Sequence, residues 1–96
     1  MNRYILAPAA RRDLRAMQAY ITQENIQAAR RVLAEIRAAC VRLADNPHLG
    51  HAREDLTDQP VRFWPVRTYY IIYRPETHPL EIVRIVHSAR DIPSFL

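Results

Sequence analysis

The chain has 96 residues, of which 49% are hydrophobic, and its 14 basic and 10 acidic side chains give a net charge of +4. This length fits one domain over residues 1–96, and the composition excludes wholesale disorder. No apolar run reaches the roughly 18–20 residues of a membrane span, and the single cysteine excludes an internal disulfide, so we expect a cytoplasmic protein with no membrane partner.

All of the basic residues are arginine, and lysine is absent. The planar guanidinium donates several hydrogen bonds and suits carboxylates and phosphates. Two partner classes follow, a nucleic acid or an acidic protein. A coding bias that replaces lysine by arginine accounts for the same composition, and the sequence leaves that choice open. No mechanism of this protein can use a lysine as acid, base or nucleophile.

The first half of the chain predicts one short strand and two helices. Residues 3–7 predict the strand, and Pro8 fits the first turn of a helix that ends near Glu24. Asn25 is a favourable N-cap for the second helix, which the run Asp45-Asn46-Pro47 ends. The apolar residues of this helix recur in steps of three and four: Ile26, Ala29, Leu33, Ile36, Cys40 and Leu43. The short connection makes the two helices antiparallel neighbours.

The second half predicts three strands after an irregular connection. Residues 47–60 are polar, contain the only glycine, Gly50, and are expected to be the most mobile segment. Strands are predicted over residues 61–66, 68–73 and 80–86, the middle one central because it is apolar on both faces. Pro65 marks an edge or a bulge. We therefore expect an α+β fold of order β-α-α-β-β-β, an antiparallel sheet with the helical hairpin on one face.

An ordered set of short motifs runs along the chain. The motifs are Ala10, Asp13-Leu14, Tyr20-Ile21, Leu43-Ala44, Pro47, Gly50, Arg53, Asp55-Leu56, Val61-Arg62, Pro65-Val66, Tyr69-Tyr70-Ile71-Ile72-Tyr73 and the run from Ile82 to His87-Ser88-Ala89-Arg90-Asp91. This ordered set resembles the ParE branch of the ParE/RelE toxin superfamily. One departure is Arg67, where a small residue such as glycine is expected in the turn. If that turn needs a positive φ, either Arg67 is strained or the turn type differs.

The resemblance implies the toxin of a bacterial type II toxin–antitoxin system. Toxins of the ParE branch poison DNA gyrase and arrest growth, and such systems stabilise plasmids. The expected partners are DNA gyrase as the target and a ParD-like antitoxin, acidic and of the ribbon-helix-helix class, which forms a hetero-oligomer with the toxin. The resemblance thus implies action by binding, without turnover.

The RelE branch of the superfamily shares the fold but cleaves mRNA on the ribosome, so the fold alone does not separate the two activities. In a RelE-like endonuclease, His87 would serve as base or acid, and Arg62, Arg84 and Arg90 would hold the phosphate. RelE-like sites tend to use lysines and a central-strand arginine, whereas this chain has no lysine and reads Tyr69-Tyr70 there. A third possibility is a relative that only binds an antitoxin or its operator DNA.

The candidate residues for binding the target or the antitoxin are therefore mostly on the strands and at the end of the last one: Arg62, Trp64, Tyr69, Arg84, His87, Arg90 and Asp91. An alternative interpretation is that His87, Arg90 and Asp91 only tie off the last strand. The other histidines have no zinc-like spacing, so we expect no metal and no cofactor. Cys40 falls on the apolar positions of the second helix and is expected to be a buried small hydrophobe.

Overall fold

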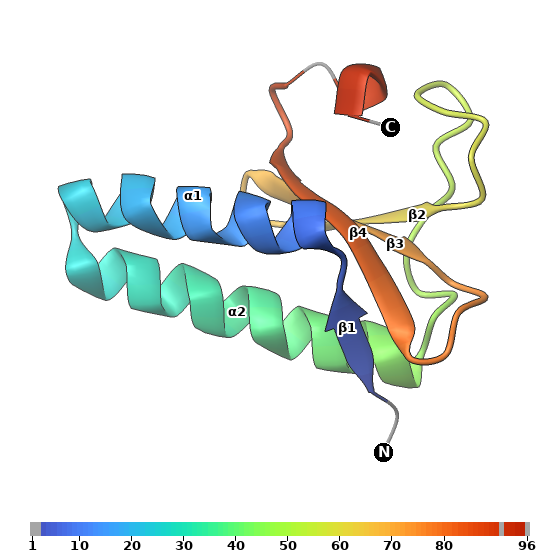
Figure 1. Cartoon of the computed structure of the whole chain (residues 1–96), viewed down its shortest axis with the longest axis horizontal. Helices are drawn as coiled ribbons and strands as arrows, with labels where there is room; N and C mark the ends of the chain where they lie inside the picture. Colours follow the sequence, from blue (N-terminus) through green and yellow to red (C-terminus); the bar gives the residue numbers. More distant parts are fainter. Residues whose placement is uncertain (1–2, 91, 96) are drawn as a thin grey trace.

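The computed structural model describes residues 3–90 and 92–95. Its elements follow in the order β1 (Tyr4–Leu6), α1 (Pro8–Glu24), α2 (Ile26–Asp45), β2 (Arg62–Val66), β3 (Tyr69–Arg74) and β4 (Leu80–His87), with a short 3-10 turn at Ile92–Phe95. The two helices form an antiparallel hairpin that lies against one face of the sheet and projects beyond it (Figure 1). The predicted α+β order is confirmed. Neither described helix is long and apolar enough to cross a membrane.

Local residue preferences determine where both helices begin and end. Pro8 occupies the first turn of α1, where the N–H that it lacks would have no helical partner. Asn25 ends α1 and caps α2, because its Oδ1 accepts a hydrogen bond from the backbone N–H of Ala28 at 3.0 Å. The predicted helix boundaries are therefore confirmed, and this single-residue connection keeps the helices antiparallel.

The sheet has the strand order β1-β4-β3-β2, so β3 and β4 are the inner strands. β2 and β4 both run antiparallel to β3, which confirms the central position predicted for the middle strand and the edge position of Pro65. The sheet is mixed, however, because β1 pairs in parallel with Leu80–Ile82 of β4. A parallel pair requires a long connection, and the one from β1 to β4 runs through the helical hairpin and then through β2 and β3. An antiparallel sheet therefore describes only β2, β3 and β4.

A β-bulge in β4 changes which side chains face the helices. Ile72 pairs with Arg84 but Tyr73 pairs with Ile82, so Val83 is the extra residue. The strict alternation of a strand would place Ile82 and Ile85 on opposite faces. With the bulge, both belong to the core beneath the helices, while Val83 and Val86 belong to the other face.

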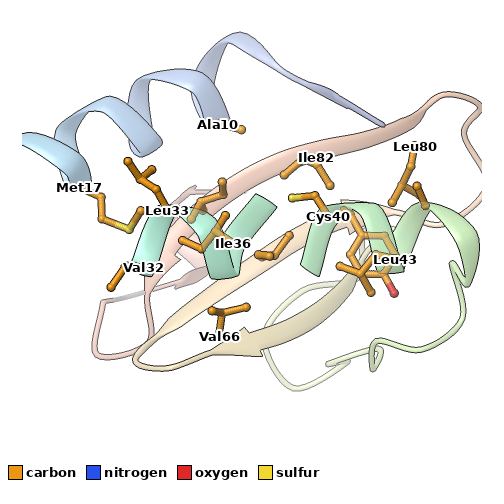
Figure 2. Close-up of a cluster of buried hydrophobic side chains, with 14 residues drawn as sticks. Ala10, Met17, Val32, Leu33, Ile36, Cys40, Leu43, Val66, Leu80 and Ile82 are labelled. Atoms are coloured by element: carbon orange, nitrogen blue, oxygen red, sulfur yellow. The ribbon is translucent and has the colours of Figure 1, made fainter. Parts of the chain in front are cut away.

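The main core lies between the helical hairpin and the sheet (Figure 2). Ile36 and Cys40 of α2 and Ile82 of β4 are nearly or fully inaccessible to solvent, and burial of a side chain of the size of isoleucine contributes about 1.5–3 kcal/mol. Burial raises the pKa of the Cys40 thiol to about 12, so this cysteine is a packed hydrophobe as predicted. A smaller cluster on the opposite face contains Phe63 and Ile72 and is covered by residues of the 47–60 connection and the 3-10 turn.

The 47–60 connection is anchored to the sheet, although the sequence predicts it to be the most mobile segment. The hydroxyl of the buried Tyr73 donates to the carbonyl of Pro47 at 2.7 Å and accepts from the N–H of Gly50 at 2.8 Å. His51 and Phe63 exchange two backbone hydrogen bonds of 2.9 and 2.8 Å. The only glycine of the chain therefore lies where a tyrosine side chain touches the backbone.

The turn between β2 and β3 holds Arg67 at φ 55°, in the left-handed region that an arginine rarely adopts. The turn thus has the positive φ at which strain was expected for a residue other than glycine. The Arg67 guanidinium donates two hydrogen bonds, of 2.8 and 2.6 Å, to the Glu35 carboxylate of α2. The turn is thus tied to the helical hairpin by a bidentate ion pair.

We expect Arg67→Gly to raise the melting temperature by about 2–4 °C in a Glu35→Ala background, where the acceptor of the Arg67 guanidinium is already absent and the backbone strain is relieved. Hydrogen bonds from Arg67 lower the pKa of Glu35. The stability from this pair is therefore present above the ordinary carboxylate pKa and is lost as the pH falls through the lowered value. Thermal melts between pH 3 and pH 7 measure both effects, and an unchanged or lower melting temperature of the double variant would refute the strain.

Candidate functional site

A groove of about 690 Å³ lies between α1 and the end of the sheet where β3 begins and β4 ends. It forms because β1 pairs only with the first residues of β4, so the rest of that edge faces α1 instead of another strand. Its lining comes from α1, the β2–β3 turn, β3, β4 and the segment after β4: Asp13, Ala16, Met17, Tyr20, Thr68, Tyr69, Ile85, Val86, His87 and Arg90. We call this feature the α1–β4 groove.

Aromatic side chains form one part of this groove. Tyr69 and His87 are register partners on β3 and β4, and their rings meet edge to face with centroids 5.4 Å apart. Tyr20 of α1 also lines the groove and is 67% exposed. Burial raises the pKa of Tyr69, so its phenol stays neutral. An exposed tyrosine beside packed aromatic rings is a common anchor for a protein partner.

The orientation of His87 is set by its own backbone. Its Nδ1 accepts a hydrogen bond from the N–H of Ala89 at 3.1 Å. A neutral imidazole that accepts at Nδ1 carries its proton on Nε2. With Nδ1 occupied in this way, Nε2 is the ring nitrogen that is left for a hydrogen bond to a partner.

An ion pair closes the β4 edge of the groove. The Asp13 carboxylate accepts two hydrogen bonds from the Arg84 guanidinium, both 2.7 Å long, and a third from the backbone N–H of Ile85 at 3.0 Å. The side chains of Arg84 and Asp13 are only 17% and 15% exposed. Asp13 thus accepts a backbone hydrogen bond from β4 that a neighbouring strand would otherwise accept. Arg84 is already paired with the Asp13 carboxylate.

The structure brings only some of the predicted site residues together. Tyr69, His87 and Arg90 line the α1–β4 groove. Arg62 lies elsewhere and lines a separate hollow of about 500 Å³, where its guanidinium donates to the carbonyl of Gly50 at 2.6 Å. The guanidinium carbon of Arg42 lies over the ring of Trp64, 5.6 Å from the ring centroid. Asp91 lies outside the described residues.

Sequence reasoning missed the part of the groove that α1 supplies. Asp13 and Tyr20 are 71 and 67 positions away from Arg84 and His87 along the chain, and only the fold brings α1 beside β4. One signal was present for Tyr20. A large aromatic residue lies next to the apolar positions of α1 without belonging to them, which is typical of a contact residue.

No three side chains of histidine, cysteine, aspartate or glutamate come close enough to hold a metal ion within residues 3–90 and 92–95. The groove is lined by two tyrosines, a histidine, several aliphatic side chains and Arg90, with the Asp13–Arg84 ion pair at its β4 edge. Such a surface can bind a polypeptide segment by burying apolar area.

The comparisons with known proteins agree with this fold. The model of the family described as "ParE toxin of type II toxin-antitoxin system, parDE" matches residues 4–92. A solved structure titled "Chromosomal ParDE TA system from P. aeruginosa" superposes with a TM-score of 0.70 at 20% sequence identity, covering 91% of this chain and 96% of the other. At this identity the structural match supports the fold alone. No curated protein matches the sequence.

Proposed function

This chain belongs to the ParE toxin family of type II toxin–antitoxin systems, and we propose that it inhibits DNA gyrase by binding, without turnover. The observation that carries the binding mode is the α1–β4 groove. Its histidine accepts a backbone hydrogen bond at Nδ1, and the arginine at its β4 edge is paired with Asp13, so the groove has the composition of a docking surface.

The groove fits a helical segment of a partner better than an added strand. Strand addition needs a free row of backbone N–H and C=O groups at the edge of a sheet. The edge of β2 is bridged by His51 and contains Pro65, and the edge of β4 beyond β1 is capped by Asp13. A partner helix instead lays apolar side chains between Tyr20 and Tyr69, an arrangement that does not require backbone pairing.

We propose that a ParD-like antitoxin neutralises the toxin by occupying the same groove. Neutralisation follows directly if the antitoxin and the target compete for one surface. An acidic, partly disordered antitoxin segment complements the net charge of +4 and folds as it docks. Arg90, which lines the groove and is exposed, adds a positive charge there.

Purified gyrase tests this proposal. The toxin is expected to stop DNA supercoiling and to make cleaved DNA accumulate, and prior mixing with an equimolar amount of the cognate antitoxin should restore activity. Full gyrase activity at a large excess of toxin would contradict the proposal. So would growth arrest with intact gyrase function and mRNA cut within translated codons, because that result identifies a ribosome-dependent endonuclease.

We expect Tyr20→Ala to weaken binding of both gyrase and antitoxin by about 2 kcal/mol, roughly 30-fold in Kd, because a partially exposed aromatic anchor is lost. Ile26→Ala is the matched control, since Ile26 is also a large apolar residue of the hairpin, 56% exposed, but lies outside the groove. Isothermal titration with each variant measures the difference. Equal affinities of the two variants would exclude the groove as the contact surface.

A further inference from the structure

A second surface of the molecule carries four arginines and lies on the outer side of the helical hairpin. Arg11 and Arg15 are one turn apart on α1, and Arg30 and Arg37 are two turns apart on α2, so each pair shares one face of its helix. All four side chains are exposed. We call these four residues the arginine seam.

The other contacts of the two helices show which way this seam faces. On α1, Asp13 and Tyr20 turn toward β4 and the groove, while Met17 points into the core. On α2, Glu35 reaches the β2–β3 turn and Ile36 points into the core. The faces with the four arginines are the remaining ones, which adjoin each other where α1 and α2 lie side by side (Figure 1).

Acidic side chains are kept away from the seam. Residues 8–45 contain seven arginines and four acidic residues, so the hairpin holds +3 of the net charge of +4. Asp13 and Glu35 are engaged by Arg84 and Arg67 from the sheet. The other two, Glu24 and Asp45, lie at the final residues of α1 and α2. No ion pair found in the described part of the chain includes an arginine of the seam.

The side chains around the seam indicate the class of partner. Ala34 and Ala38 are exposed beside it, and the exposed large apolar residues on that side of α2 are aliphatic: Ile26, 56% exposed, and Val41, 39% exposed. The hot spots of protein interfaces are Trp, Tyr and Arg side chains that are desolvated in well-packed pockets, and single-stranded nucleic acids depend on aromatic stacking. The four arginines of the seam are exposed, and Tyr4, an aromatic residue near Arg37, is partly buried against the core. The phosphate backbone of a duplex needs only guanidinium groups on an open surface.

We propose that the arginine seam binds the phosphate backbone of double-stranded DNA without sequence preference. The contacts are made by guanidinium groups to phosphate oxygens, which position a protein on a duplex but do not read its bases. The α1–β4 groove is on a different face, so a toxin bound to DNA keeps its groove open for a protein partner. The inference does not depend on which enzyme the toxin inhibits.

Fluorescence anisotropy with a labelled duplex of arbitrary sequence, in the absence of gyrase, tests the proposal. Four phosphate contacts predict a slope of log K against log salt concentration of about −3.6, which is roughly a 100-fold loss of affinity between 50 and 200 mM salt. A single strand of the same length should bind more weakly. Absence of duplex binding at 50 mM salt, or tighter binding of the single strand, would overturn the proposal.

A pair of charge-matched variants separates the seam from net charge. Arg15→Gln/Arg30→Gln removes two seam residues and is expected to reduce the salt slope by about 2 and the affinity at 50 mM salt by tenfold or more. Arg3→Gln/Arg74→Gln removes the same charge from outside the hairpin and should keep the slope. Circular dichroism confirms that both variants are folded. Equal losses in the two variants would assign the binding to net charge and refute a defined surface.

Discussion

Replacement of Gly50 by alanine is expected to lower the free energy of unfolding by about 3 kcal/mol, a large part of the 5–15 kcal/mol typical of a small domain. A Cβ at this position would lie 2.5 Å from the hydroxyl oxygen of Tyr73 and 2.8 Å from its Cε1. The Tyr73 side chain is fully buried and cannot move aside without breaking its hydrogen bonds to Gly50 and Pro47. Urea denaturation of the two proteins measures the change.

Tyr73→Phe separates the steric part of this effect from the hydrogen bonds. The substitution removes the partner of the Gly50 N–H and of the Pro47 carbonyl and should cost about 1–3 kcal/mol by itself. The double variant Gly50→Ala/Tyr73→Phe should be less destabilised than the sum of the single variants, because the closest clash disappears with the hydroxyl. Gly50→Ala with wild-type stability, or strict additivity, would contradict the packing around Gly50.

Asp13→Ala is expected to cost about 2–4 kcal/mol and to perturb the groove. It removes the carboxylate from Arg84 and the acceptor of the Ile85 N–H in one step. Loss of one partner from a buried ion pair costs about 3–5 kcal/mol, and the remaining exposure of these two side chains reduces that figure. Asp13→Asn, which keeps an acceptor but loses the charge, should cost about half as much.

The same pair gives a double-mutant cycle. Asp13→Leu/Arg84→Met removes both charges, so its cost should fall well below the sum of the single substitutions. Chemical denaturation supplies all four free energies. A coupling energy near zero would mean that Asp13 and Arg84 do not stabilise each other, and the edge of the groove would then have to be held by other contacts.

The sequence alone predicts those elements that are determined by interactions within a few residues along the chain. The proline at position 8, the cap at Asn25 and the two-sided apolar pattern of β3 each act within a few residues, and all of them predict the structure that is found. Arg67 belongs to the same class, because a two-residue turn between strands restricts φ whatever lies around it.

The parts that the sequence did not predict depend on contacts between distant segments. The parallel pairing of β1 with β4 requires knowledge of where the hairpin returns the chain. The sequence makes Arg84 a candidate for phosphate binding, but in the structure the Asp13 carboxylate from α1 neutralises its charge. Arg62 and His87 look like members of one cluster when the strands are taken one by one, whereas the register places them at separate hollows.

We propose that this toxin engages gyrase through the α1–β4 groove. Hydrogen exchange of the toxin, measured with and without gyrase, locates the contact surface along the chain. We expect slower exchange in the second half of α1 around Tyr20, at Thr68 and Tyr69, and from Ile85 to Arg90 when gyrase is present. Protection confined to β1, β2 or the 47–60 connection, with unchanged exchange along the groove, would contradict it.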